Sequence, residues 1–268
     1  MKHKKKQKKI FATIQARMGS TRLPGKVLKK IDGIPLLEYQ IKRIKKSKTI
    51  DNVIIATTKK KEDDKIINLA KKLNVLYFRG SNKDVLKRIT DATKKFKFDI
   101  NVELISDSPF SDIKIIDKMV KFFLKNKDKY DYVSNGIKMT YPSGMEACIY
   151  ESKTLINIEK KIKKNNKMRE HVECHFTKNK KLRKCNISAP KKYNYPNIFL
   201  EVDTPEDFIM VSKIYKYFNK KKILNFYLGD ILKFLKKNKQ IIEINNKVPR
   251  SWKRLKVSTM KNIKNVQF

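Results

Sequence analysis

The residues best suited to chemistry lie in one basic loop near the start of the chain, from residue 16 to residue 26. This loop contains Arg17, Arg22 and Lys26, together with Gly19 and Gly25. Glycine lets backbone N–H groups approach an extended anion closely, and guanidinium groups match the geometry of phosphate oxygens. The loop therefore predicts a polyphosphate site. It is not a Walker A loop, because GxxxxGK[ST] is absent, and its composition alone is also typical of a surface turn.

Two aspartates are candidates for a metal site. Asp107 and Asp203 each follow an apolar run that we predict to be a strand, and each lies two residues before a proline. Carboxylates at the carboxyl ends of strands can hold Mg²⁺ beside phosphates, and two of them can share one ion. The alternative for each aspartate is the cap of a helix or a turn.

Three further groups are weaker candidates. Arg79-Gly80-Ser81 follows another predicted strand and suits either contact with a nucleotide base or a plain turn. Arg169-Glu170-His171 begins a predicted helix, where the histidine either contacts an acidic substrate or is structural. Glu146 follows Gly144 closely and either binds substrate hydroxyls or a second magnesium, or lies exposed on a strand.

The first half of the chain alternates between strands and helices with short connections. Apolar runs predict strands over 10–15, 53–58, 75–78 and 100–105, and helical spacing predicts helices over 36–44, 62–73, 83–96 and 113–125. This alternation predicts a mostly parallel sheet with helices on both faces. Ligands of such sheets bind beyond the carboxyl ends of the strands. We therefore expect loop 16–26, residues 79–81 and Asp107 to share one crevice.

The second half is less regular. We expect strands over 132–135, 145–150 and 199–202, a turn over 141–144, and helices over 153–163, 168–176, 208–218 and 223–235. Residues 203–207 have the composition of a helix start, with a proline just inside an acidic first turn. The basic tail from about residue 236 is weakly patterned.

Composition limits the class of protein. The 268 residues suit one large α/β domain. The net charge of +40 favours either solvated faces rich in lysine or a polyanionic partner; because the lysines are scattered, we prefer the first. The three cysteines form no CxxC pair, which predicts thiols in a reducing cytoplasm rather than zinc or disulfides. We expect no signal peptide and no membrane span.

The motifs together resemble a known family. In their order they are similar to the cytidylyltransferases that include spore-coat polysaccharide enzymes, whose broader relatives make CMP-activated sialic acids and CMP-activated octulosonate. The resemblance covers roughly residues 10–215. The matching segments are 14–28, 55–58, 78–81, 84–86, 131–135, 141–144, 169–172 and 202–207.

The resemblance implies a fold and an activity. The fold is a three-layer, GT-A-like α/β fold with a mostly parallel mixed sheet. The activity is transfer of CMP from CTP to an acidic sugar or related oxyanion acceptor, with release of pyrophosphate, in the synthesis of surface polysaccharide precursors. It also implies Mg²⁺ as cofactor and is compatible with a homodimer; no specific nucleic acid is expected as a partner.

The resemblance also assigns residues by position. Arg17, Lys26 and Asp107 are implied to be catalytic, and Asp107 and Asp203 to bind the metal. The implied acceptor contacts are Glu146, Arg169, Glu170 and His171. The implied nucleotide contacts are Ala16, Arg17, Met18, Gly19, Ser20, Arg22, Lys26, Thr57, Arg79, Gly80, Ser81 and Val85.

Two departures from the family pattern leave the acceptor open. Ser106-Asp107-Ser108-Pro109 stands where the family usually has Gly-Asp-Cys-Pro, and Glu103 stands where an arginine is common. We divide the chain into a basic extension (1–9), a nucleotidyltransferase domain (10–218) and a basic helical extension (219–268). The alternatives are a glycosyltransferase, which normally shows an Asp-x-Asp motif that Ser106-Asp107-Ser108 lacks, and a non-enzymatic polyanion-binding protein.

Overall fold

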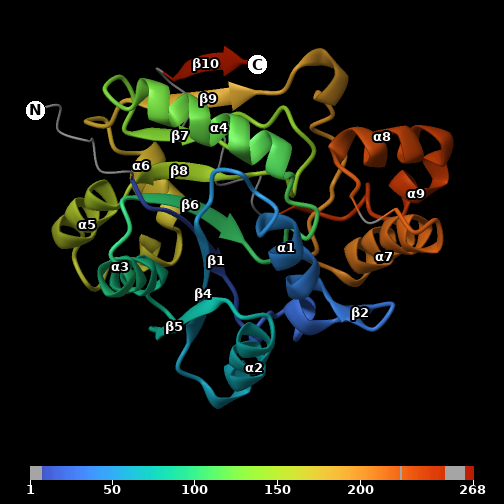
Figure 1. Ribbon diagram of the computed structural model, residues 1–268, viewed down its shortest axis with the longest axis horizontal. Coiled ribbons are helices and arrows are strands. Elements are labelled where there is room, and N and C mark those ends of the chain that lie inside the picture. The colour runs from blue at the N-terminus through green and yellow to red at the C-terminus, as the bar shows by residue number, and fades with distance from the viewer. Residues whose placement is uncertain (1–7, 224, 251–262) are drawn as a thin grey trace, which may run out of the picture.

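The central feature of the computed structural model, which describes residues 8–223, 225–250 and 263–268, is an eight-stranded sheet. Its strand order is β10-β9-β7-β8-β6-β1-β4-β5 (Figure 1). The strands β1, β4, β5 and β6 are mutually parallel, and β8 runs antiparallel to β6 and β7. The predicted mostly parallel mixed sheet is confirmed. The strands are β1 (Ile10–Gln15), β4 (Asn52–Thr58), β5 (Leu76–Gly80), β6 (Ile100–Ile105), β7 (Tyr132–Ser134), β8 (Cys148–Glu151), β9 (Lys184–Ser188) and β10 (Lys264–Gln267).

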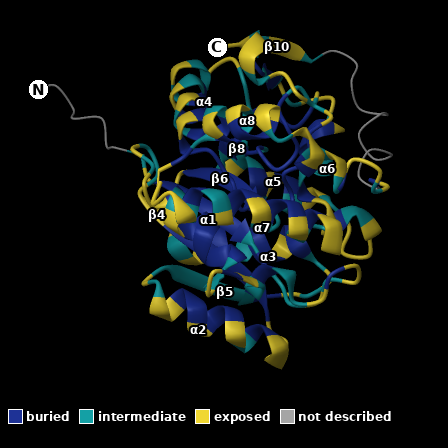
Figure 2. Cartoon of the chain, turned by 90° about the vertical axis from the view of Figure 1, so that its right-hand side faces the viewer, coloured by how far each residue is buried: buried dark blue, intermediate teal, exposed yellow. Residues whose placement is uncertain are grey.

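Helices cover both faces of this sheet, which confirms the three layers. Helices α1 (Leu36–Ile44), α2 (Asp64–Lys72) and α4 (Ile113–Asn126) pack on one face, and α1 and α4 lie in front of the sheet in Figure 1. On the other face are α3 (Val85–Phe96), α5 (Ser152–Lys161) and α6 (Val172–Thr177). In Figure 2 the strands β6 and β8 are buried between these layers. Within the described ranges, no helix is both long and apolar enough to span a bilayer.

Short elements connect these layers. The strands β2 (Lys30–Ile31) and β3 (Ile34–Pro35) form a small antiparallel hairpin after the first loop. The 3-10 turns are η1 (Lys26–Leu28), η2 (Lys61–Asp63), η3 (Lys167–Glu170) and η4 (Lys191–Tyr193).

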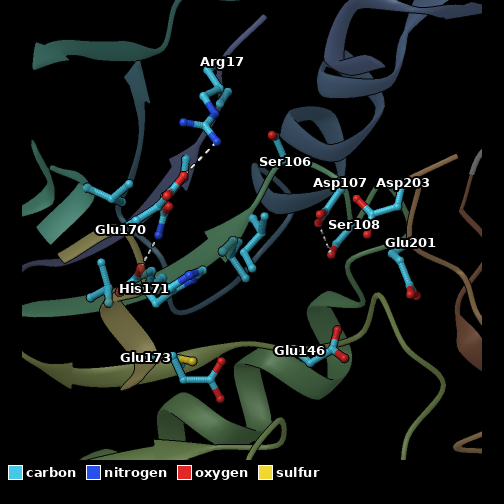
Figure 3. A pocket seen from close by; sticks show the side chains of 18 of the residues that line it. Arg17, Ser106, Asp107, Ser108, Glu146, Glu170, His171, Glu173, Glu201 and Asp203 are labelled. Atoms are coloured by element: carbon cyan, nitrogen blue, oxygen red, sulfur yellow. Dashed lines mark hydrogen bonds and ion pairs between the residues drawn. The ribbon is translucent and has the colours of Figure 1, made fainter. Parts of the chain in front are cut away.

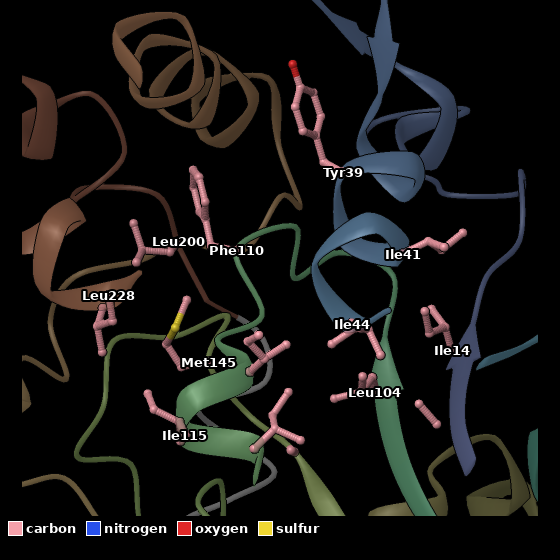
Figure 4. Close-up of a cluster of buried hydrophobic side chains, with 14 of the residues drawn as sticks. Ile14, Tyr39, Ile41, Ile44, Leu104, Phe110, Ile115, Met145, Leu200 and Leu228 are labelled. Atoms are coloured by element: carbon pink, nitrogen blue, oxygen red, sulfur yellow. The ribbon is translucent and has the colours of Figure 1, made fainter. Parts of the chain in front are cut away.

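The C-terminal helices share the main core. Helix α7 (Pro205–Lys220) is followed by α8 (Leu228–Lys237) and α9 (Lys239–Glu243). Leu228 of α8 belongs to the same buried cluster as Ile14 of β1, and Figure 4 shows how this cluster is assembled. Residue 218, our boundary, falls inside α7. The division of the chain stays a prediction, and residues 1–7, 224 and 251–262 of the two extensions lie outside the described residues.

Local sequence explains most of these elements. Strand β1 is buried on both sides, as a continuous apolar run in the middle of a parallel sheet should be. Asp84 caps α3 by accepting a hydrogen bond from the Lys87 N–H. Thr204 and Asp207 form a capping box around Pro205, which fixes the start of α7.

The structure corrects four expectations. The predicted strand over 199–202 is only an isolated bridge between Ser143 and Phe199. Strand β5 continues through Arg79 and Gly80, so these residues do not form a loop. The predicted helix over 168–176 is the turn η3 followed by α6. Strands β9 and β10 were not predicted, because their apolar character is weak and their pairing is long-range.

Candidate functional site

A cavity of about 520 Å³ lies at the carboxyl ends of β1 and β6. Figure 3 shows side chains from both halves of the chain facing it. The expected crevice therefore receives loop 16–26 and Asp107, but it does not receive residues 79–81. The predicted site residues that line the cavity are Ala16, Arg17, Gly19, Ser20, Arg22, Lys26, Val85, Asp107, Glu146, Glu170, His171 and Asp203.

Backbone hydrogen bonds hold the basic loop on the cavity wall. The Met18 carbonyl accepts from the Ser20 and Gly25 N–H groups at 2.8 and 3.0 Å. The Met18 N–H donates to Asp63 Oδ1 at 2.7 Å, which ties the loop to the start of α2. Gly25 has φ +65°, a left-handed conformation that favours glycine. In this compact loop Met18 packs against the core, and Arg17, Ser20 and Arg22 line the cavity.

One end of the cavity carries two carboxylates with a lysine between them. Lys26 Nζ lies 2.7 Å from Asp203 Oδ1 and 3.5 Å from Asp107 Oδ2. Arg22 Nη2 lies 2.9 Å from Asp203 Oδ2. The Val202 N–H donates to the Asp107 carbonyl at 2.8 Å, so the backbone itself holds the two aspartates together.

Charge and burial perturb this end strongly. Burial raises the pKa of the Asp107 carboxyl; Lys26 opposes the shift, and the neighbouring Asp203 and Glu146 add to it. Burial alone would lower the pKa of Lys26, but the two aspartates raise it above its ordinary value. Lys26 is therefore a fixed positive charge between two negative ones.

The two aspartates fit a magnesium ion that binds together with a polyphosphate. Mg²⁺ commonly takes one or two protein carboxylates and fills its other positions with water and phosphate oxygens. Within the described part of the chain, no group of three or more His, Cys, Asp or Glu residues is placed to hold a metal. Asp107 and Asp203 therefore suit a shared ion rather than a cage built by the protein alone.

The other end of the cavity mixes charges of both signs. Figure 3 places Arg17, Glu170, His171 and Glu173 together, away from Asp107 and Asp203. Arg17 Nη2 and Glu170 Oε1 form an exposed ion pair of 2.9 Å. Exposed pairs of this kind contribute little to stability, so Arg17 remains available to a ligand.

Six predicted contacts do not line the cavity. Arg79 donates to the Thr58 and Lys60 carbonyls and pairs with Asp64 at 2.6 Å, so it joins β5 to the start of α2. Arg169 is buried between Asp84 and Glu159, at 2.7 and 2.6 Å, and joins η3 to α3 and α5. Both guanidinium groups are used by the protein itself. The residues outside the lining are Met18, Thr57, Arg79, Gly80, Ser81 and Arg169.

Glu103 and Arg88 are among the cavity residues that sequence analysis missed as site candidates. Glu103 of β6 accepts hydrogen bonds from Gln15 and Tyr150, and burial raises its pKa to about 7. Arg88 of α3 is 2% exposed and also lines the cavity. Two signals in the sequence could have found them. Glu103 is a charged residue inside an apolar strand, and Arg88 lies at helical spacing from the apolar Val85.

Comparisons with known proteins identify the family of this chain. A sequence profile of cytidylyltransferases matches residues 11–248. An uncharacterized protein of Methanocaldococcus jannaschii is 39% identical over 241 residues, which cover 90% of this chain and 96% of that one. The spore coat polysaccharide biosynthesis protein SpsF of Bacillus subtilis is 31% identical over 212 residues, which cover 77% and 86%.

Solved structures show the same fold. A cytidylyltransferase from Leptospira borgpetersenii serovar Hardjo-bovis superposes with a TM-score of 0.81 at 34% identity, over 88% of this chain and 97% of that one. A CMP:2-keto-3-deoxy-manno-octonic acid synthetase complexed with CTP superposes with a TM-score of 0.59 at 15% identity, over 78% and 99%. Fold and site thus define a nucleotidyltransferase of the α/β nucleotide-sugar transferase type. The chain belongs to the cytidylyltransferase family.

Proposed function

We propose that this protein transfers CMP from CTP to an acidic sugar or related oxyanion acceptor, releasing pyrophosphate, in the synthesis of surface polysaccharide precursors. The observation that carries the proposal is Lys26 held between Asp107 and Asp203 at one end of the cavity. This arrangement combines carboxylates suited to Mg²⁺ with a cation suited to phosphate oxygens. The relative named for spore coat polysaccharide biosynthesis supports the pathway.

The donor half of the site is the basic loop and the two aspartates. The loop cradles the triphosphate, with Arg17 and Lys26 countering charge on the reacting phosphate. Asp107 and Asp203 would hold Mg²⁺, which would supply charge neutralisation and orientation. The acceptor oxygen forms a bond to the α-phosphorus as the bond to the pyrophosphate oxygen breaks. Such a transfer depends mainly on positioning and electrostatics.

The acceptor half is lined by the second part of the chain. Glu146, whose Oε2 accepts from the Gly144 N–H at 2.7 Å, faces the cavity with Glu170 and His171. We assign these residues to the acceptor and Val85 to the nucleotide. Arg79 and Arg169, which lie outside the lining, support the surrounding elements through their ion pairs.

A pyrophosphate-release assay tests the proposal. Wild-type protein is screened with four nucleoside triphosphates and a panel of sugar acids and phosphonates, and we expect release with CTP. Asp107→Asn should lower this release by at least about 100-fold, the usual scale for losing one electrostatic contact to the reacting centre. Circular dichroism should show an unchanged fold.

Asp128→Asn is the matched control, because Asp128 is exposed and does not line the cavity. Its turnover should stay within about twofold of wild type, as for most surface substitutions. Full turnover in Asp107→Asn would rule out the metal assignment, and release with no CTP–acceptor combination would rule out the activity.

A further inference from the structure

Arg88 is a buried cation that has no salt-bridge partner among the described residues. It is 2% exposed, and it lines the cavity. Its Nη1 donates to the Ser81 carbonyl at 2.6 Å, while its buried Nε has no partner among the described residues. In the same ranges, Arg88 forms no ion pair, unlike buried Arg169. A charge removed from water without a partner is strongly unfavourable, so its retention at a cavity points to a ligand.

The fold makes room for this arginine. A Cβ atom at Gly80 would lie 2.7 Å from Arg88 Cγ and 3.0 Å from its Cβ. Only glycine therefore lets the aliphatic stem of Arg88 lie against the end of β5. Together with the bond to the Ser81 carbonyl, this close packing fixes where the guanidinium stands.

The electrostatics of the cavity also favour an anion at this point. Burial, and to a smaller extent the nearby Arg17, lower the pKa of Arg88 to about 10, so the group is still protonated at neutral pH. Asp63, Asp84 and Glu103 act in the opposite direction with smaller effects. Both oxygens of Glu103 already accept hydrogen bonds, from Gln15 and Tyr150. Two guanidinium groups thus line one cavity, and of the two only Arg17 has an ion-pair partner among the described residues, Glu170.

The parts of the substrates can be assigned by charge. The proposed function assigns the triphosphate to Lys26, Arg17 and the two aspartates, and a nucleoside base and ribose are neutral. The remaining anion is on the acceptor. We propose that Arg88 binds the carboxylate of the acceptor and thereby selects acidic acceptors. This inference rests on the proposed function for the identity of the donor and deepens it for the acceptor.

Arg88→Met tests the inference by kinetics, because methionine replaces most of the stem without the charge. With a sugar acid that the wild type uses, the KM for the acceptor should rise at least tenfold while the KM for CTP stays within twofold. Replacing the acceptor carboxylate by a carboxamide should weaken binding to the wild type and have little effect on Arg88→Met. The inference would be overturned if Arg88→Met raised only the KM for CTP. It would also be overturned if the substitution weakened binding of the acid and of the carboxamide by the same factor.

Stability gives a readout that does not need turnover. Without ligand, Arg88→Met should have a Tm equal to or above that of the wild type, because a buried charge with no salt-bridge partner among the described residues is removed. Arg169→Met is the matched control, and its Tm should fall by several degrees because it leaves Asp84 and Glu159 without their partner. A fall in Arg88→Met as large as in the control would mark Arg88 as structural.

Calorimetric binding separates this inference from the proposed function. The probes are 3-deoxy-manno-octulosonate and N-acetylneuraminate, titrated into wild type and Arg88→Met with CTP present. If either acid binds the wild type at least tenfold more tightly than the variant, yet no pyrophosphate is released, the inference stands and the proposed reaction fails. If pyrophosphate is released but both proteins bind the acid equally, or if neither acid binds the wild type, the inference fails.

Discussion

Lys26 is the residue on which the candidate site depends. Two half-buried carboxylates close to one another repel, and the ammonium of Lys26 between Asp107 and Asp203 offsets that repulsion. The sequence left metal binding and capping open for both aspartates. In the structure Thr204 is the N-cap of α7, and Asp207 completes the box, so the Asp203 side chain is available to the site.

Glu103 should make stability depend on pH. Its pKa is about 7 in the folded protein, against 4.5 ordinarily. Between these values the folded state keeps a proton that the unfolded state has released, so the free energy of unfolding falls as pH rises and stays low above about 7. Glu103→Gln removes the titrating carboxyl and therefore the loss of stability at high pH. We expect the variant to gain up to roughly 3 kcal/mol over wild type at pH 8, and much less at pH 5.

Urea unfolding at both pH values measures this difference. Glu62→Gln, whose side chain is 48% exposed, is the control and should change stability by less than about 0.5 kcal/mol at either pH. An advantage of Glu103→Gln that is the same at pH 5 and pH 8 would contradict the prediction.

At the scale of elements, the turn at residues 141–144 positions the segment that carries Asp203. The Ser143 N–H donates to the Ile198 carbonyl at 3.0 Å, and the Leu200 N–H donates back to Ser143 at 2.9 Å. Gly144 has φ +91°, and a Cβ there would lie 2.7 Å from the Glu201 N atom. The two segments can approach this closely only because residue 144 has no side chain.

Gly144→Ala should therefore destabilise the protein and weaken the site. We expect a loss of about 2–4 kcal/mol, from left-handed strain together with a backbone clash. Gly33→Ala is the matched control, since Gly33 has φ +78° but open space around it, and should lose only about 1–2 kcal/mol. Thermal unfolding and the KM for CTP of both variants measure the effect. Equal losses would show that the close approach is unimportant.

At the scale of the whole molecule, residues near the C-terminal end reach back behind the site. Arg250 is buried and pairs with Asp207 at 2.7 Å, and Asn245 donates to the Phe199 carbonyl at 3.0 Å. Asp207 in turn accepts from the Asp203 N–H at 3.0 Å. The part of the chain after residue 218 thus supports the segment that carries Asp203, whatever further role it has.

The net charge of +40 should accelerate capture of CTP. A positive field attracts a triphosphate at a distance, and salt screens that field over about 10 Å at 0.1 M. We expect kcat/KM for CTP to fall roughly three- to tenfold between 20 and 300 mM NaCl, with sucrose of equal osmolality as the control. A flat response would support the alternative that the lysines only solvate the surface.

The sequence alone determined the features that depend on neighbouring residues. Periodicity placed the central strands and most helices within a few residues, and the basic loop that the sequence singled out lines the cavity. Tertiary structure decided which side chains are buried and which partners from distant segments they contact. Arg79 and Arg169 looked like ligand contacts but pair within the protein, whereas Arg88 and Glu103 turned out to face the cavity. Burial and partners from remote segments set whether a charge is satisfied, and local spacing does not contain that information.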